Sequence, residues 1–148
     1  MNKNRKLAKS KYSHKYKLIN SDSSRCYYCG GPSECKDHFP ALLNLLKYTS
    51  DAYDDIGYHK IPSCAECNCL LRDHDSASIF HRRIELKTRL HKKYRKILKS
   101  AEWSADEIKE LDGQLREYVE NLFLLKDWIE RRLAYPHSDP YFWYSRLE

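Results

Sequence analysis

Apolar residues in the second half of the chain recur at steps of three and four, the spacing of one face of an α-helix. The first run predicts a helix over roughly 76–99. Ser104 and Glu107 then have the spacing of a capping box, and a second apolar run continues to about Ala134. Because the link between the two runs is short, we expect a helical hairpin over 76–135.

The first half of the chain lacks this periodicity. Residues 26–75 hold all six cysteines, and their turn-forming residues predict short strands and turns around a metal centre. The expected fold class is therefore α+β: a small metal-stapled module over 26–75, followed by the helical hairpin over 76–135. A basic, flexible N-terminal arm over 1–25 and an aromatic C-terminal tail over 136–148 complete the predicted organisation.

Charge is concentrated at the N-terminus. The 148 residues carry 27 Lys and Arg against 21 Asp and Glu, a formal net charge of +6. Residues 1–25 hold eight basic groups and one acid, hence +7, so the other 123 residues sum to −1. Tyr12 and Tyr16 are interleaved with these lysines, as suits binding to a polyanion such as nucleic acid. A solvated leader that only aids solubility has the same composition.

Composition excludes several classes of protein. No apolar run approaches the ~20 residues of a membrane span, so we expect no membrane association. No apolar stretch follows the basic N-terminus, which argues against a secretory signal and for a cytoplasmic protein. The four glycines match neither a P-loop nor a dinucleotide-binding fingerprint. Six cysteines in such a protein indicate metal binding or reduced thiols rather than a disulfide framework.

Four of the cysteines form two C-x2-C pairs separated by 34 residues, Cys26 with Cys29 and Cys64 with Cys67. A two-residue spacer lets one tight turn direct two thiolates at one ion, so two pairs predict a tetrahedral structural Zn²⁺ site. A thioredoxin-like redox site would need one pair in a strand–helix setting.

Cys35 and Cys69 are left over, and either could replace a zinc ligand. We expect both to be small buried hydrophobic residues.

Polar residues with catalytic chemistry flank these pairs. Asp37 and His38 lie between them, and Asn68 directly follows Cys67. The knuckles would bring these segments together, so that Asp37 and Asn68 offer oxygen ligands to a divalent cation. His38 would point the other way on an extended strand, where it could act as a general base.

This order of motifs resembles the HNH nucleases of the ββα-metal fold in their zinc-stapled form. Its layout is similar to the phage-type recombination endonuclease VII group, over about residues 26–73. The resemblance implies an HNH-type endonuclease that hydrolyses DNA phosphodiester bonds in a phage or bacterial cytoplasm. Asp37 and Asn68 would hold a catalytic Mg²⁺ or another divalent ion, and His38 would activate water.

One position departs from the family pattern. The middle motif position is commonly Asn and is His59 here. We expect His59 to pin a loop, although its imidazole could instead approach the metal or the phosphate. Lys36 and Arg72 are candidates for contacting the phosphate, and His74 is expected to be solvated.

Partners follow from charge and from the helices. Basic residues of the first helix would contact phosphates without reading sequence. The long second helix and the aromatic tail allow a homodimer or a larger complex. Two alternatives stay open: a non-catalytic zinc-stapled module that binds nucleic acid or protein, and a nuclease subunit of a larger defence complex. The basic helix residues are Arg82, Arg83, Lys87, Arg89, Lys92, Lys93, Arg95 and Lys96.

Overall fold

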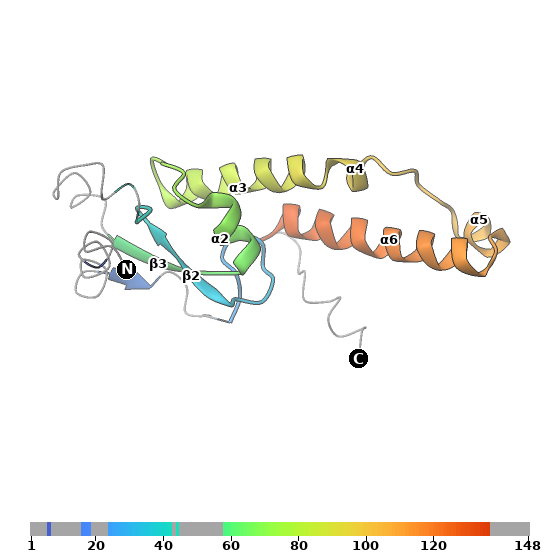
Figure 1. The fold of residues 1–148 in the computed structure, drawn as a ribbon, viewed down its shortest axis with the longest axis horizontal. Coiled ribbons are helices and arrows are strands. Elements are labelled where there is room, and N and C mark those ends of the chain that lie inside the picture. Colours follow the sequence, from blue (N-terminus) through green and yellow to red (C-terminus); the bar gives the residue numbers. More distant parts are fainter. Residues whose placement is uncertain (1–5, 7–15, 19–23, 43, 45–57, 137–148) are drawn as a thin grey trace.

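The computed structural model describes residues 6, 16–18, 24–42, 44 and 58–136, with the backbone alone for 16–18. A small sheet and a short helix form one end of the described part, and an arm of helices extends away from them (Figure 1). The prediction of a mixed fold of helices and strands is confirmed. The elements are β1 (Tyr16–Leu18), β2 (Cys35–Phe39), β3 (Tyr58–Ser63), α2 (Ala65–Leu71), α3 (Ile79–Lys93), α4 (Arg95–Leu98), α5 (Ala105–Glu110) and α6 (Gly113–Ala134).

The sheet has the strand order β1-β3-β2. Strands β2 and β3 are antiparallel, with Asp37 opposite Ile61, and β1 adds to β3 in parallel. Within the predicted basic arm over 1–25, the three residues of β1 pair with the central strand. The rest of the arm up to residue 23, apart from residue 6, lies outside the described residues, as does 137–148 of the predicted tail.

Each predicted helix is interrupted once. The first run of apolar residues forms α3 and α4, which meet at Tyr94. The predicted capping box at Ser104 is confirmed and starts α5. The chain then breaks at Leu111, and the Asp112 side chain accepts the Leu115 amide and starts α6. A second N-cap therefore divides what the apolar spacing predicted as one helix.

α3 and α4 run alongside α6, which returns so that its C-terminal end lies near α2 (Figure 1). We call residues 79–134 the helical arm. The core of the sheet end is formed by β2, β3, α2 and α3, with Ile61, Leu71 and Leu86 fully buried. No helix in the described part is long and apolar enough to cross a lipid bilayer.

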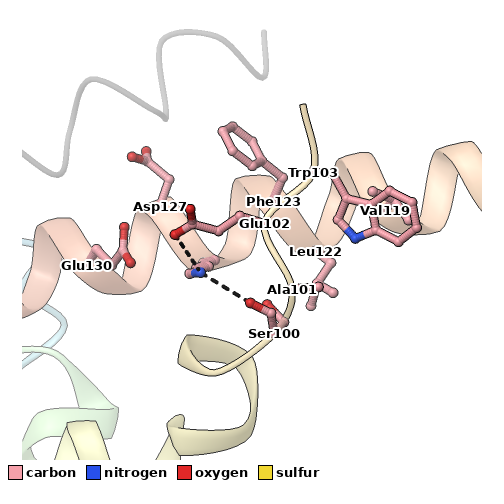
Figure 2. Close-up of a pocket in the computed structure, with 10 residues that line it drawn as sticks. Ser100, Ala101, Glu102, Trp103, Val119, Leu122, Phe123, Asp127 and Glu130 are labelled. Carbon is pink, nitrogen blue, oxygen red and sulfur yellow. Dashed lines mark hydrogen bonds and ion pairs between the residues drawn. The ribbon is translucent and has the colours of Figure 1, made fainter. Parts of the chain in front are cut away.

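In the half of the helical arm farther from the sheet, large apolar side chains are exposed to solvent. Between the α4–α5 linker and α6 lies a hollow of about 300 Å³, lined by Trp103, Val119 and Phe123 among others (Figure 2). Lys126 closes one side, since its Nζ donates to the Ser100 carbonyl at 3.3 Å. Several large apolar side chains on α6 are exposed, Tyr118 at 64%.

Candidate functional site

The two C-x2-C pairs meet in space, as predicted. The sulfur atoms of Cys26, Cys29, Cys64 and Cys67 all lie within 4.8 Å of one another, and we call them the four-cysteine cluster. The Sγ atoms of Cys29 and Cys64 are 3.8 Å apart, far beyond a disulfide bond of about 2.05 Å. Tetrahedral zinc with Zn–S bonds of about 2.3 Å places its sulfurs about 3.8 Å apart. The cluster therefore fits a structural metal ion such as zinc.

Local backbone structure presents each pair. The Cys26 amide donates to the Gly31 carbonyl at 2.7 Å, and the Gly30 amide returns a bond to the Cys26 carbonyl at 2.8 Å. Gly30 has φ 74°, in the left-handed region where glycine is strongly favoured. Cys64 is the N-cap of α2, and its sulfur accepts the Cys67 amide at 3.4 Å. A turn and a helix start thus aim two sulfurs each at one point.

The crowded sulfurs affect one another's ionisation. Hydrogen bonds from the neighbouring thiols, that of Cys26 first, hold the pKa of Cys29 below its usual range. Hydrogen bonding within the cluster, with Cys26 again the largest cause, raises the pKa of Cys64 and of Cys67. Four thiolates at this distance repel one another, and a divalent cation bound between them offsets the repulsion.

The two remaining cysteines lie outside the cluster. Cys35 is half-buried, and its thiol contacts the Ser63 carbonyl at 3.2 Å and the Asn68 amide nitrogen at 3.5 Å. Cys69 is exposed on α2, so the prediction that it is buried is wrong. The helix turns its side chain away from the core that buries Leu71.

Asp37 is buried on β2, and both of its carboxylate oxygens already have donors. Arg82 donates from Nε to Oδ2 at 2.7 Å and from Nη2 to Oδ1 at 3.0 Å. The Tyr28 hydroxyl donates to Oδ2 at 2.5 Å, and the His38 amide donates to Oδ1 at 2.9 Å. Burial and then the Asp37 charge raise the pKa of Tyr28, which keeps its proton for this bond.

These contacts bear on the predicted catalytic ion site. The Asn68 side chain turns its amide nitrogen to Cys35, while a guanidinium neutralises Asp37. In the described conformation the cation that pairs with the Asp37 carboxylate is Arg82, and the divalent ion shared by Asp37 and Asn68 stays a prediction.

The burial of Arg82 contradicts its predicted contact with a phosphate. Its side chain is fully buried, and it donates to the His74 carbonyl at 2.6 Å and to the Arg72 carbonyl at 3.0 Å. Burial alone would lower the pKa of Arg82, but the Asp37 carboxylate outweighs it and raises that pKa. This side chain joins α3, β2 and the loop after α2, so it is not available to a phosphate.

Other basic residues of α3 also bond within the protein. Arg83 donates to the Tyr27 carbonyl at 2.8 Å and lies 3.8 Å from the centre of its ring. Lys87 donates to the Arg132 carbonyl, and Arg89 donates to the Leu70 carbonyl at 2.6 Å. The predicted phosphate contacts stay a prediction for the exposed basic residues, of which Lys93 pairs with Glu66: Lys92, Lys93, Arg95 and Lys96.

His38 lies on the opposite side of β2 from Asp37. The register places His38 opposite Lys60 of β3, and Lys36 is two residues before it on the same face. Lys36 is exposed, and His38 and Lys60 are half-buried. One face of the hairpin thus carries three basic side chains. The sequence motif indicated Lys36 and His38 but not Lys60.

The remaining predicted residues have structural surroundings. His59 lies within β3, and its ring stacks on Phe39 with centroids 6.4 Å apart. His74 is half-buried, with Nδ1 3.1 Å from Nη2 of Arg89, so the expectation of a solvated side chain is only partly met.

Comparison of the chain with models of known protein families, with curated proteins and with solved structures gives no match.

Proposed function

We propose that this protein is a metal-dependent endonuclease of the HNH type, which hydrolyses phosphodiester bonds in DNA on a zinc-stapled ββα module. The observation that supports the proposal most is the order of the elements around the four-cysteine cluster. A β2–β3 hairpin carries Asp37 and His38 on its first strand, and α2 follows with Asn68 next to Cys67. The resemblance to HNH nucleases implies this same succession.

His38 is the candidate general base. A neutral imidazole titrates near physiological pH and can accept the proton of an attacking water. Lys36 and Lys60 share its face of the hairpin, so they can attract and orient a phosphodiester there. Water attack forms a new P–O bond and breaks the bond between phosphorus and the 3′ oxygen, and His38 accepts the proton of that water. The leaving 3′ oxygen takes a proton from solvent, which gives the 5′-phosphate and the 3′-hydroxyl that the resemblance implies.

The resemblance also implies the divalent ion, and metal dependence is part of the proposal for that reason. Asp37 is not an open ligand in the described conformation, because Arg82 and Tyr28 occupy its oxygens. The same ion pair favours a second candidate function, a zinc-stapled nucleic-acid-binding module that performs no catalysis.

Binding of Mn²⁺ distinguishes the two candidates. Zinc-loaded protein is titrated with Mn²⁺ and free ion is followed by electron paramagnetic resonance. A nuclease with an ion at Asp37 binds one Mn²⁺ that Asp37→Asn loses, whereas the binding module binds none in either form.

A cleavage assay tests the catalytic proposal. Supercoiled plasmid and labelled linear, branched and single-stranded substrates are incubated with Mg²⁺ or Mn²⁺ and the wild type, His38→Ala or His91→Ala. His91 is an exposed histidine of α3 and serves as the matched control. Loss of a general base lowers the rate by about 10²–10⁴-fold, so His38→Ala should fail where His91→Ala cleaves. Absence of cleavage by the wild type, or equal rates for all three proteins, contradicts the proposal.

A further inference from the structure

The C-terminal end of α6 lies near α2 (Figure 1), and one of its side chains contacts the four-cysteine cluster. Arg132, two residues before the end of α6, is only 2% exposed. Its Nη2 donates to the Cys67 sulfur at 3.8 Å. A basic side chain from the last described helix therefore contacts a sulfur of the candidate metal centre, although 65 positions separate the two residues.

Neighbouring groups fix this guanidinium in place. Its Nη1 lies 2.7 Å from Oε2 of Glu66, which belongs to α2 between the two cysteines of the second pair. Its Cζ lies 4.3 Å from the centre of a Trp128 ring, and Lys87 of α3 donates to its backbone carbonyl. A planar guanidinium held on several sides presents its N–H groups in fixed directions, as a bond to a thiolate requires.

The charge of the site explains why a cation is needed there. Four thiolates around one divalent ion leave a net charge of −2, and Cys26, Cys29 and Cys67 are fully buried. A guanidinium keeps its proton in proteins, and the Glu66 carboxylate lies 2.7 Å from Nη1 of Arg132. Arg132 therefore stays charged and offsets part of the thiolate charge in a region that excludes water.

We propose that Arg132 is an outer-shell cation of the metal centre and that it couples metal occupancy to the docking of α6. The metal-bound thiolates supply the negative charge that anchors the helix, and the helix supplies the donor that stabilises the thiolates. Because such coupling is reciprocal, loss of the metal weakens the docking of α6, and loss of Arg132 weakens metal retention. This role does not depend on endonuclease activity and holds equally for a non-catalytic module.

A spectroscopic measurement separates this role from simple packing. Co²⁺ replaces zinc in the full chain, and the thiolate-to-cobalt charge-transfer band is recorded for the wild type, Arg132→Met and Arg131→Met. Arg131 is the matched control, since it pairs with Asp127 at 2.9 Å at the surface. Loss of an N–H···S bond raises the energy of the sulfur electrons, so Arg132→Met should shift the band to longer wavelength. Arg131→Met should superimpose on the wild type, and Arg132→Lys should recover part of the shift.

Metal retention and helix docking give the second readout. Removal of an outer-shell partner lowers metal affinity about 10–100-fold, so Arg132→Met should release zinc to a chromophoric chelator correspondingly more readily. Arg131→Met should stay within about twofold of the wild type, because the Arg131 side chain pairs with Asp127 and not with Glu66 of the second cysteine pair. In the zinc-loaded Arg132→Met protein, amide exchange of residues 126–134 should accelerate more than that of 113–122.

The proposal is overturned if the Arg132 and Arg131 variants have the same cobalt spectrum and the same zinc retention. If Arg132→Met does not fold, Arg132→Gln, which keeps N–H donors but carries no charge, decides the question. A shifted band and weaker zinc retention in Arg132→Gln support the role, and a wild-type band with wild-type retention contradicts it.

Discussion

Replacing Arg82 with methionine tests whether the buried ion pair with Asp37 stabilises the sheet end of the molecule. The two side chains are 0% and 4% exposed, so Arg82→Met leaves a carboxylate buried with only Tyr28 and a backbone amide as donors. Breaking a buried pair by removing one partner costs about 3–5 kcal/mol. The exposed pair between Arg116 and Glu120 is the control, since surface pairs of this spacing contribute about 0.3–0.5 kcal/mol.

Urea unfolding of the zinc-loaded protein measures the effect. With a dependence of about 2 kcal/mol per molar urea, Arg82→Met should lower the unfolding midpoint by about 2 M. Arg116→Met should leave it nearly unchanged. Adding Asp37→Asn to Arg82→Met removes the unpaired charge and keeps a partner for Tyr28, so this double variant should recover at least half of the loss. A single variant that loses less than about 1 kcal/mol, or a double variant as unstable as the single one, refutes the reasoning.

Further predictions concern the metal, a helix start and self-association. Stripping the metal with a chelator, or Cys64→Ser, should abolish the cooperative thermal transition because metal binding and folding are coupled; an unchanged melting curve contradicts this. The pKa of Glu107 lies below its ordinary 4.5, chiefly because the Ser104 backbone N–H donates a hydrogen bond to the Glu107 carboxylate. The contribution of the capping box to α5 should therefore be present above pH 4.5 and fade as the pH falls below it. An NMR titration midpoint for Glu107 at or above 4.5 would show that the box does not form in solution. A homodimer through the arm should dissociate in Tyr118→Glu/Phe123→Glu when measured by sedimentation velocity, and a wild type that is monomeric at all concentrations excludes it.

The sequence predicts the four-cysteine cluster and the helices well because both depend on short-range patterns. A C-x2-C spacing constrains two ligands within one turn, and the capping box at Ser104 involves residues three apart. The sequence does not predict the break between α5 and α6, because the apolar spacing continues through it. The N-cap bond from the Leu115 amide to the Asp112 side chain starts a new helix there.

The partners of the charged residues could not be predicted, because they come from distant parts of the chain. Arg82 is 45 positions from Asp37, and the helix pattern alone gives it the same appearance as the exposed Lys92. Tyr28 lies in the spacer of the first C-x2-C pair, where no motif assigns it a role, yet it donates to the same carboxylate. The sequence does not predict strand β1 either, because its three residues stand among lysines and show no clear alternation of polar and apolar side chains.

Zinc in the four-cysteine cluster is the claim on which the fold, the proposed endonuclease and the coupling of α6 all depend. X-ray absorption spectroscopy at the zinc edge of the purified full chain tests it most directly. We expect one zinc per chain with four sulfur neighbours at about 2.3 Å and no nitrogen or oxygen ligand. A chain that binds no zinc, or zinc with oxygen or nitrogen in place of one of these sulfurs, contradicts the account.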